Sequence, residues 1–128
     1  MKRGSAMAKK HGIIYGDRNE TFKSVHRYVQ MSARKIRPYA DLVRGVYADE
    51  ALEILSCYPS RGAKLVRQAV YNAIKNAEDR IVSGKISDLE VIDIRIDGGP
   101  MGKRFRPKSR GSSSVYFKRS SHITVVVG

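Results

Sequence analysis

One stretch of the sequence limits what this chain can fold into more than any other. Residues 102–122, GKRFRPKSRGSSSVYFKRSSH, contain seven Lys and Arg residues, one His and no acid. The segments on both sides have the residue patterns of β-strands, so the stretch connects two strands. A structureless loop of about twenty residues is uncommon inside a compact domain. We therefore expect the two strands to continue outward as a long β-hairpin over about residues 98–122.

The geometry of this hairpin follows from its composition. Small turn residues are concentrated at Gly111-Ser112-Ser113-Ser114, where the turn is predicted. Each limb then has roughly ten residues, and at about 3.3 Å per residue the hairpin reaches roughly 30 Å beyond the domain. An isolated two-stranded hairpin is marginally stable in water, and this one contains few apolar residues. It therefore needs another surface to lie on.

Three segments have the pattern of strands. Residues 92–97, IDIRID, alternate strictly between apolar and charged side chains, which predicts a strand with one buried face. Residues 122–127 form a second strand, and the β-branched and aromatic residues of 25–31 indicate a short third one. Gly98-Gly99-Pro100 is interpreted as a bend or bulge at the base of the hairpin.

Three helices are predicted between the strand at 25–31 and the strand at 92–97. Ser32 stands at the N-cap position of a helix from Ala33 to about Arg44, which Gly45 ends. Pro38 lies beyond the first turn of this helix, so it should kink the helix or shift its start. A short amphipathic helix follows and is ended by Pro59; its apolar face is formed by Ala48, Ala51, Leu52 and Leu55.

The third helix is the longest. Ser60 can cap its first turn, and the helix is expected to reach about Arg80. Its buried face is predicted to consist of Val66, Ala69, Val70, Ala73 and Ala77. The fold class is therefore α+β, with three helices packed on a small antiparallel sheet and a long protruding β-hairpin arm. Residues 25–128 form this domain, and residues 1–24 are expected to be a basic tail that orders on a partner.

The charge of the chain is large and unevenly distributed. The 128 residues have room for about one domain, and 25 Lys plus Arg against 12 Asp plus Glu leave a net charge of +13. Residues 31–97 are nearly balanced, with 11 basic and 10 acidic residues, whereas residues 98–128 contain seven basic residues and no acid. Such a chain attracts a polyanion. A solvated loop that only aids solubility is the simpler alternative, but it would not require the complete absence of acids.

The arm has the side chains that nucleic acids bind. Arginine meets phosphate with a planar fork, lysine is a flexible point charge, and Phe105, Tyr116 and Phe117 could stack on exposed bases. The predicted RNA-binding residues of the arm are Lys103, Arg104, Arg106, Lys108, Arg110, Lys118, Arg119 and His122. An architectural DNA-binding protein with β-ribbon arms is the alternative, with Pro107 as a wedge between base steps. It fits less well, because the tip is Gly/Ser-rich and the body shows no obvious dimer seam.

Catalytic, metal and cofactor sites are not expected. His11, His26 and His122 are scattered, and Asp93 and Asp97 fall on the solvent side of their strand with Arg95 between them. Gly98-Gly99-Pro100 is not followed by the Lys and Thr or Ser of a phosphate-binding loop. We therefore predict a protein that is not an enzyme and that needs no cofactor.

The lack of a signal peptide and of a membrane-spanning stretch predicts a soluble, intracellular protein. Cys57 cannot form an intramolecular disulfide, and it is interpreted as a small core residue. No signal peptide and no stretch long enough to span a bilayer are present, so no membrane partner is expected. An organellar transit peptide is the less favoured alternative, because residues 1–24 include Asp17 and Glu20 and show no clear amphipathic stripe.

Four motifs, in this order, resemble one family. They are MSARKIRPYADLVRGVYADEALEIL, RGAKLVRQAVYNAIKNAE, VIDIRIDGGPMGKRFRPKSRG and KRSSHITVVV, and together they cover roughly residues 25–128. The chain is thereby similar to the universal L-twenty-two family of large-subunit ribosomal proteins, in its bacterial form. The resemblance implies a structural constituent of the cytoplasmic large ribosomal subunit. It would bind large-subunit ribosomal RNA beside neighbouring ribosomal proteins and aid subunit assembly, and its hairpin would line the nascent-peptide exit tunnel.

The resemblance also implies roles for particular residues. Arg34, Lys35 and Arg37 would face RNA, because Ser-Ala-Arg-Lys at 32–35 agrees with the family's helix start. Ser112-Ser113-Ser114 departs from the Arg-Gly-Arg-Ala common at the family's tip, and Pro38 stands where an aliphatic residue is commoner. The tip that would face the tunnel consists of Lys108, Ser109, Arg110, Gly111, Ser112, Ser113, Ser114 and Tyr116.

Overall fold

The computed structural model describes residues 9–10, 13–14, 21–80 and 89–128. Its elements, in chain order, are β1 (Lys9–Lys10), β2 (Ile13–Ile14), β3 (Phe22–Val29), α1 (Ala33–Val43), α2 (Ala48–Ser56), α3 (Arg61–Glu78), β4 (Val91–Pro107), the 3-10 turn η2 (Ser109–Gly111) and β5 (Ser113–Val127).

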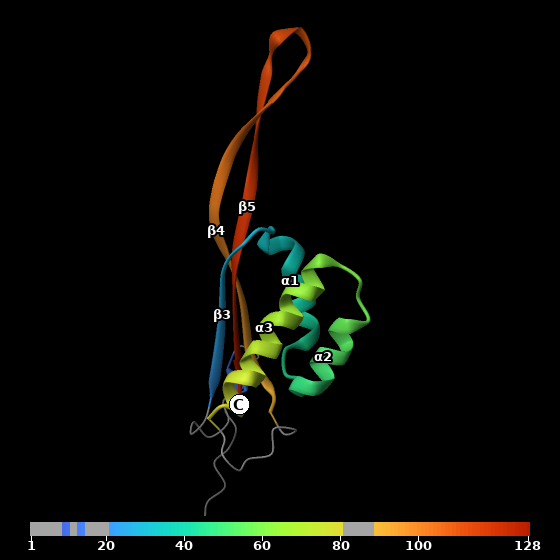
Figure 1. The fold of residues 1–128 in the computed structure, drawn as a ribbon, viewed down its shortest axis with the longest axis vertical. Helices are drawn as coiled ribbons and strands as arrows, with labels where there is room; N and C mark the ends of the chain where they lie inside the picture. The colour runs from blue at the N-terminus through green and yellow to red at the C-terminus, as the bar shows by residue number, and fades with distance from the viewer. Residues whose placement is uncertain (1–8, 11–12, 15–20, 81–88) are drawn as a thin grey trace, which may run out of the picture.

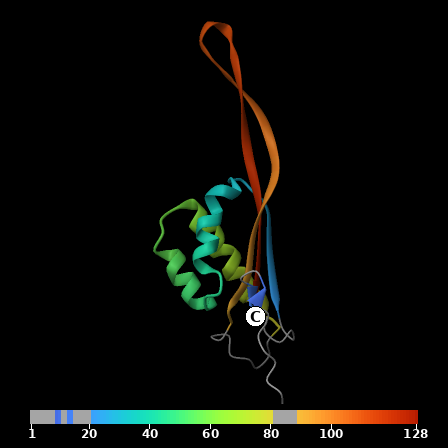
Figure 2. The ribbon, with the colours of Figure 1, turned by 180° about the vertical axis from the view of Figure 1, so that it is seen from behind.

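The main sheet is antiparallel and has the strand order β3-β5-β4, so β5 is its central strand. All three helices lie on one side of this sheet, as the two opposite views show: α1 and α3 pack on it, and α2 packs against α1 and α3 (Figures 1 and 2). Beyond the helices, β4 and β5 continue as a two-stranded ribbon that projects from the body (Figure 1). The predicted α+β class with a protruding hairpin is therefore confirmed.

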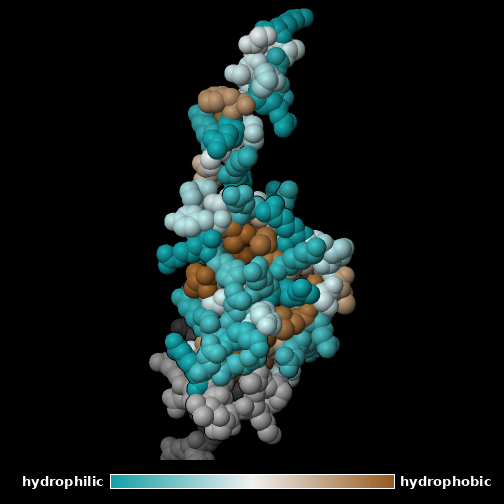
Figure 3. Space-filling model, in the orientation of Figure 1, coloured by the Kyte–Doolittle hydropathy of each residue, from teal (hydrophilic) through white to brown (hydrophobic). Residues whose placement is uncertain are grey.

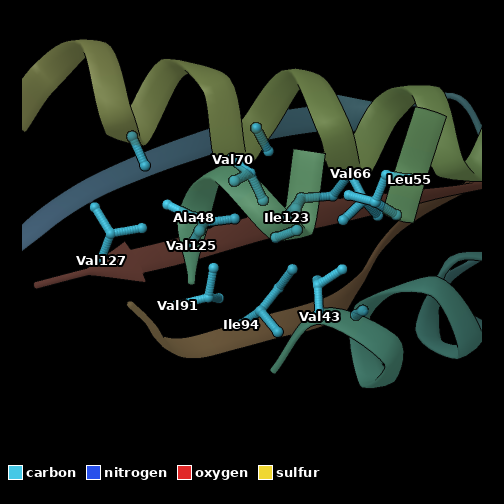
Figure 4. Close-up of a cluster of buried hydrophobic side chains, with 14 of the residues drawn as sticks. Val43, Ala48, Leu55, Val66, Val70, Val91, Ile94, Ile123, Val125 and Val127 are labelled. Carbon is cyan, nitrogen blue, oxygen red and sulfur yellow. The ribbon is translucent and has the colours of Figure 1, made fainter. Parts of the chain in front are cut away.

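The core lies between the sheet and the helices. Alternate residues of β5, from Ser121 to Val127, are buried, as the period of two predicts. Figure 4 shows Ile123 and Val125 of β5 between side chains of α3 and β4. On α3, all five residues of the predicted buried face are buried, and the small alanines among them allow the helix backbone to lie close to the sheet.

The first helix differs from its prediction in two details. Ser32 is the N-cap residue, but its side chain accepts no hydrogen bond from the helix. The helix runs on through Pro38, so the expected shift of its start is wrong. Three buried residues spaced by four and three, Ile36, Ala40 and Val43, hold the helix against the core, which offsets the hydrogen bond that Pro38 cannot donate. Gly45, with a φ of +76°, follows the helix as predicted.

The ends of the other helices were predicted more closely. The hydroxyl of Ser60 accepts a hydrogen bond from the backbone N–H of Ala63 at 3.2 Å, and α3 ends at Glu78.

The prediction that Cys57 is a core residue is wrong, because its side chain is exposed. It follows the last turn of α2, where Leu55 is the last buried residue, and its thiol donates to the carbonyl of Glu53 at 3.4 Å.

The boundary between tail and domain also differs. The sheet begins at Phe22, whose buried side chain stands opposite Val127, so three residues that the sequence placed in the tail belong to β3. The strand ends at Val29 rather than Met31. Within the tail, β1 pairs with β2, which a segment with no strand period did not predict. The rest of the tail lies outside the described residues.

Candidate nucleic-acid interface

The arm is a continuous antiparallel ladder from its base to Pro107, which stands opposite Ser113. Its turn consists of residues 108–112, where Lys108 donates its N–H to the carbonyl of Ser112 at 2.7 Å. Arg110 and Gly111 take the left-handed conformation, with φ of 58° and 71°. The turn predicted at 111–114 is therefore wrong by a few residues, and Ser113 and Ser114 belong to β5. Gly111 was the signal that could have located the turn, because short hairpin loops often end with a glycine in the left-handed conformation.

A bulge at the base of the arm confirms the interpretation of the Gly-Gly-Pro segment. The register shifts between Gly98, which pairs with Ser121, and Met101, which pairs with Arg119, so β4 has one more residue than β5 between these two pairs. Gly99 is required there, because a Cβ atom on it would lie 2.5 Å from Oγ of Ser120 and 3.1 Å from the carbonyl carbon of the same residue. The Ser120 hydroxyl donates to the carbonyl of Pro100 at 2.6 Å. A bulge bends its strand and increases the local twist, which turns the ribbon away from the body.

The ladder sorts the side chains of the arm onto two faces. One face is aromatic and apolar at its centre, because Phe105 stands opposite Val115 and Lys103 opposite Phe117. We call it the aromatic face; it consists of Met101, Lys103, Phe105, Val115, Phe117 and Arg119. The opposite face is cationic, and we call it the basic face; it consists of Arg104, Arg106, Ser114, Tyr116 and Lys118.

Cations lie over three of the rings of the arm. The Arg106 guanidinium is 5.4 Å from the centre of the Tyr116 ring, the Lys103 ammonium is 5.9 Å from that of Phe105, and the Arg119 guanidinium is 5.9 Å from that of Phe117. Phe105 is still 67% exposed. Figure 3 shows the ribbon as a largely hydrophilic surface with a few apolar side chains. Such an arm can offer phosphates a row of charges and bases an exposed ring.

Two of the three basic residues predicted on the body extend the cationic surface. Arg34 and Lys35 are exposed on the first turn of α1, which lies close to the base of the arm (Figure 1). Arg37 is also exposed, but it donates from Nη2 to the carbonyl of Ile96 at 3.2 Å. It therefore ties α1 to β4, in addition to any role at the surface.

The predicted residue His122 is engaged within the sheet. Its Nδ1 accepts a hydrogen bond from the backbone N–H of Tyr28 at 3.0 Å. The two rings meet edge to face, with centroids 5.0 Å apart. Since Nδ1 is the acceptor, the neutral ring carries its proton on Nε2, which is then the nitrogen that can donate to a phosphate.

Other titratable groups of the described residues make structural contacts. His26 lies 2.8 Å from the Asn72 amide through Nε2, and Asp93 is paired with Arg95 at 2.8 Å. In the parts of the chain that the structure describes, no group of three or more His, Cys, Asp or Glu side chains is placed to hold a metal ion. None of the described helices is both long enough and apolar enough to cross a membrane.

Comparison with known proteins identifies relatives over the whole body and arm. A family model described as ribosomal protein L22p/L17e matches residues 24–128. The large ribosomal subunit protein uL22 of Rhodopirellula baltica is 44% identical over 108 residues, an alignment that covers 81% of this chain and 91% of that protein. The family match begins within β3 and includes both strands of the arm.

Proposed function

The chain belongs to the ribosomal protein L22p/L17e family, and from this membership we propose that its arm binds large-subunit ribosomal RNA and lines the nascent-peptide exit tunnel. As a family member it is a structural constituent of the large ribosomal subunit, in the cytoplasmic ribosome, and not an enzyme. Architectural DNA binding, the alternative considered from the sequence, is set aside by this membership.

The separation of charge and aromatic rings on the arm supports RNA binding. The basic face carries Arg104, Arg106 and Lys118, which fit phosphate oxygens, while the aromatic face carries exposed rings for unpaired bases. Residues 98–128 contain no acid that would oppose this contact. Arg34 and Lys35 add two charges on the body beside the base of the arm.

The division into body and arm supports a role in subunit assembly. The ribbon extends away from the helices (Figure 2), so body and arm contact different RNA segments, and neighbouring ribosomal proteins pack against the remaining surface of the body. A two-stranded ribbon gains most of its order from the surface it binds. The same binding event then orders the arm and holds the RNA segments together.

The tip has the properties of a tunnel wall. Residues 108–114 are small or basic and largely exposed, and Tyr116 stands just below them on the basic face. Because three serines follow Gly111, the tip offers hydroxyl groups and the cations of Lys108 and Arg110 to a passing peptide. We propose that residues 108–114, with Tyr116, face the nascent chain.

A single-cysteine cross-linking experiment tests the tunnel proposal. Cys57 is the only cysteine of the chain and is exposed on the body, so the unaltered protein serves as the matched control. The test variant combines Cys57→Ser with Ser112→Cys, and each protein is coupled to the same short photoreactive group and assembled into ribosomes that hold a stalled, radiolabelled peptide. We expect labelled peptide on the Ser112→Cys protein and none on the control. Equal labelling of both proteins, or labelling through Cys57 alone, would refute a tunnel-facing tip.

A further inference from the structure

A hollow of about 500 Å³ lies where the arm joins the body. Its walls come from the arm and from the segment between β3 and α1, and they consist of Gln30, Arg104, Lys118, Arg119 and Ser120. Three of these five side chains are cationic and none is acidic. The volume falls in the range of small-molecule sites, and it exceeds what a single phosphate group fills.

Tyr28, which stands two residues before Gln30 of the hollow, has an unusual backbone. Its φ is 57°, in the left-handed region that a bulky residue rarely adopts. The β3 ladder is irregular at the same place, between His26 and Val29. The strain does not serve burial, because the Tyr28 side chain is 64% exposed. What holds the residue there is its N–H bond to His122 and the edge-to-face contact of the two rings.

The pairing of β5 with β3 and β4 relates the hollow to Tyr28. The irregularity in β3 and the bulge in β4 both flank the same short stretch of β5, around Ser121, which stands opposite Val29 on one side and Gly98 on the other. Ser120 of the hollow and His122, the partner of Tyr28, are two residues apart on β5. They therefore share one face of the strand, about 6.6 Å apart. His122 therefore links the exposed ring of Tyr28, which is not itself part of the wall, to the wall of the cationic hollow.

We propose that this junction binds one unpaired nucleotide of RNA, stacked on Tyr28, with its phosphate held by Arg104 and Lys118. The inference rests on the proposed function and adds to it a specific nucleotide site at the base of the arm. Arg104 and Lys118 reach the phosphate from the arm, and the Gln30 amide bonds the edge of the base or the 2′-hydroxyl. Arg119 donates from Nη1 to the Met101 sulfur at 3.0 Å, which holds its guanidinium on the aromatic face, so the phosphate contacts come from Arg104 and Lys118 of the basic face.

Stacking on an exposed ring selects single-stranded RNA. Bases inside an A-form helix are stacked on each other and offer no free face, whereas loops and bulges present bases that can be splayed onto an aromatic side chain. A free anion would need neither the ring of Tyr28 nor a hollow of this size. The chemistry of the site is therefore that of a nucleotide within an RNA strand.

The test uses substitutions of Tyr28 in the full chain. Tyr28→Gly removes the ring and is compatible with the positive φ; the relief of backbone strain offsets the lost contact with His122, so the thermal unfolding midpoint should stay close to that of the parent. Dissociation constants are measured by filter binding, at one fixed salt concentration, for a large-subunit ribosomal RNA transcript and for a short single-stranded RNA. We expect Tyr28→Gly to weaken both at least about fivefold. Tyr28→Phe, which keeps the ring, should bind like the parent.

Tyr47→Ala is the matched control. Tyr47 is 58% exposed and forms a β-bridge with Glu90. Glu90 in turn is hydrogen-bonded to Gly128, at the end of the body opposite the arm (Figure 1). Its removal should leave both dissociation constants unchanged.

If the parent binds the transcript and Tyr28→Gly binds it equally well, the nucleotide site is wrong and the proposed function stands. If the parent does not bind the transcript, the proposed function itself fails. If inorganic phosphate at matched ionic strength displaces the short RNA completely, the hollow is a plain anion site and the inference is overturned.

Discussion

Simultaneous replacement of Arg104, Arg106 and Arg110 with Ala is expected to weaken binding to large-subunit ribosomal RNA about 100-fold at about 0.15 M salt. The physical reason is counterion release, in which each phosphate contact contributes about 0.6 to 0.7 log units of affinity at this salt concentration. All three side chains are exposed on the arm, where they contribute nothing to the core. Filter binding over a salt series measures the effect, and the slope of log K against log salt should fall by about two to three units.

A variant with the same change in net charge is the control for this experiment. Arg61, Lys64 and Arg67 are exposed on α3, and their joint replacement with Ala also removes three positive charges. If binding depends on the arm, this control should lose much less affinity than the arm variant. Equal losses in the two variants would mean that net charge, rather than the arm, sets the affinity.

Replacement of Ile123 with Ala is expected to destabilise the body by about 2–5 kcal/mol, a large part of the stability of a small domain. Ile123 lies in the central strand with 0% exposure, between β3, β4 and the helices (Figure 4). The loss combines the transfer free energy of the removed carbons with the cavity that they leave. Urea unfolding followed by circular dichroism gives the free energy of unfolding directly.

Val115→Ala is the matched control for the core, because it lies in the same strand but on the arm. Its side chain is 44% exposed and packs mainly against Phe105 across the ribbon. We expect its effect on the free energy of unfolding to be within about 0.5 kcal/mol. A cost for Val115→Ala as large as that for Ile123→Ala would show that the arm unfolds together with the core, and the division into a stable body and a marginal arm would be wrong.

The parts of the fold that could be predicted from the sequence are those where a local period reflects burial. The five apolar residues of α3 and the alternation from Ile94 to Asp97 are of this kind. Ile92 and Asp93 depart from the predicted alternation, because the register shifts between Val91 and Asp93 and leaves both half-buried. The turn was misplaced because its position depends on which residues pair across the ribbon, and serines alone do not specify the pairing of Pro107 with Ser113. Cys57 was misassigned because the sequence does not show whether a small apolar residue just after a helix lies on its buried face or on its exposed face.

The candidate site was predictable in its charge and not in its geometry. The arm's seven cations can be read from the sequence, because no acid interrupts them. Their division into a basic and an aromatic face requires the strand register. Tyr28 and Gln30 were not predicted at all. A positive φ at a tyrosine has no sequence signal, since it arises from the ladder irregularity and the contact with His122.

The most direct test of ribosomal RNA as the partner is sedimentation of a native lysate through a sucrose gradient after a high-salt wash, with this chain quantified by mass spectrometry. We expect the chain to stay in the large-subunit fraction at one copy per subunit, because body and arm are anchored in ribosomal RNA at many phosphates. Loss of the chain from that fraction, or its appearance with nucleoid DNA, would contradict the assignment of its partner.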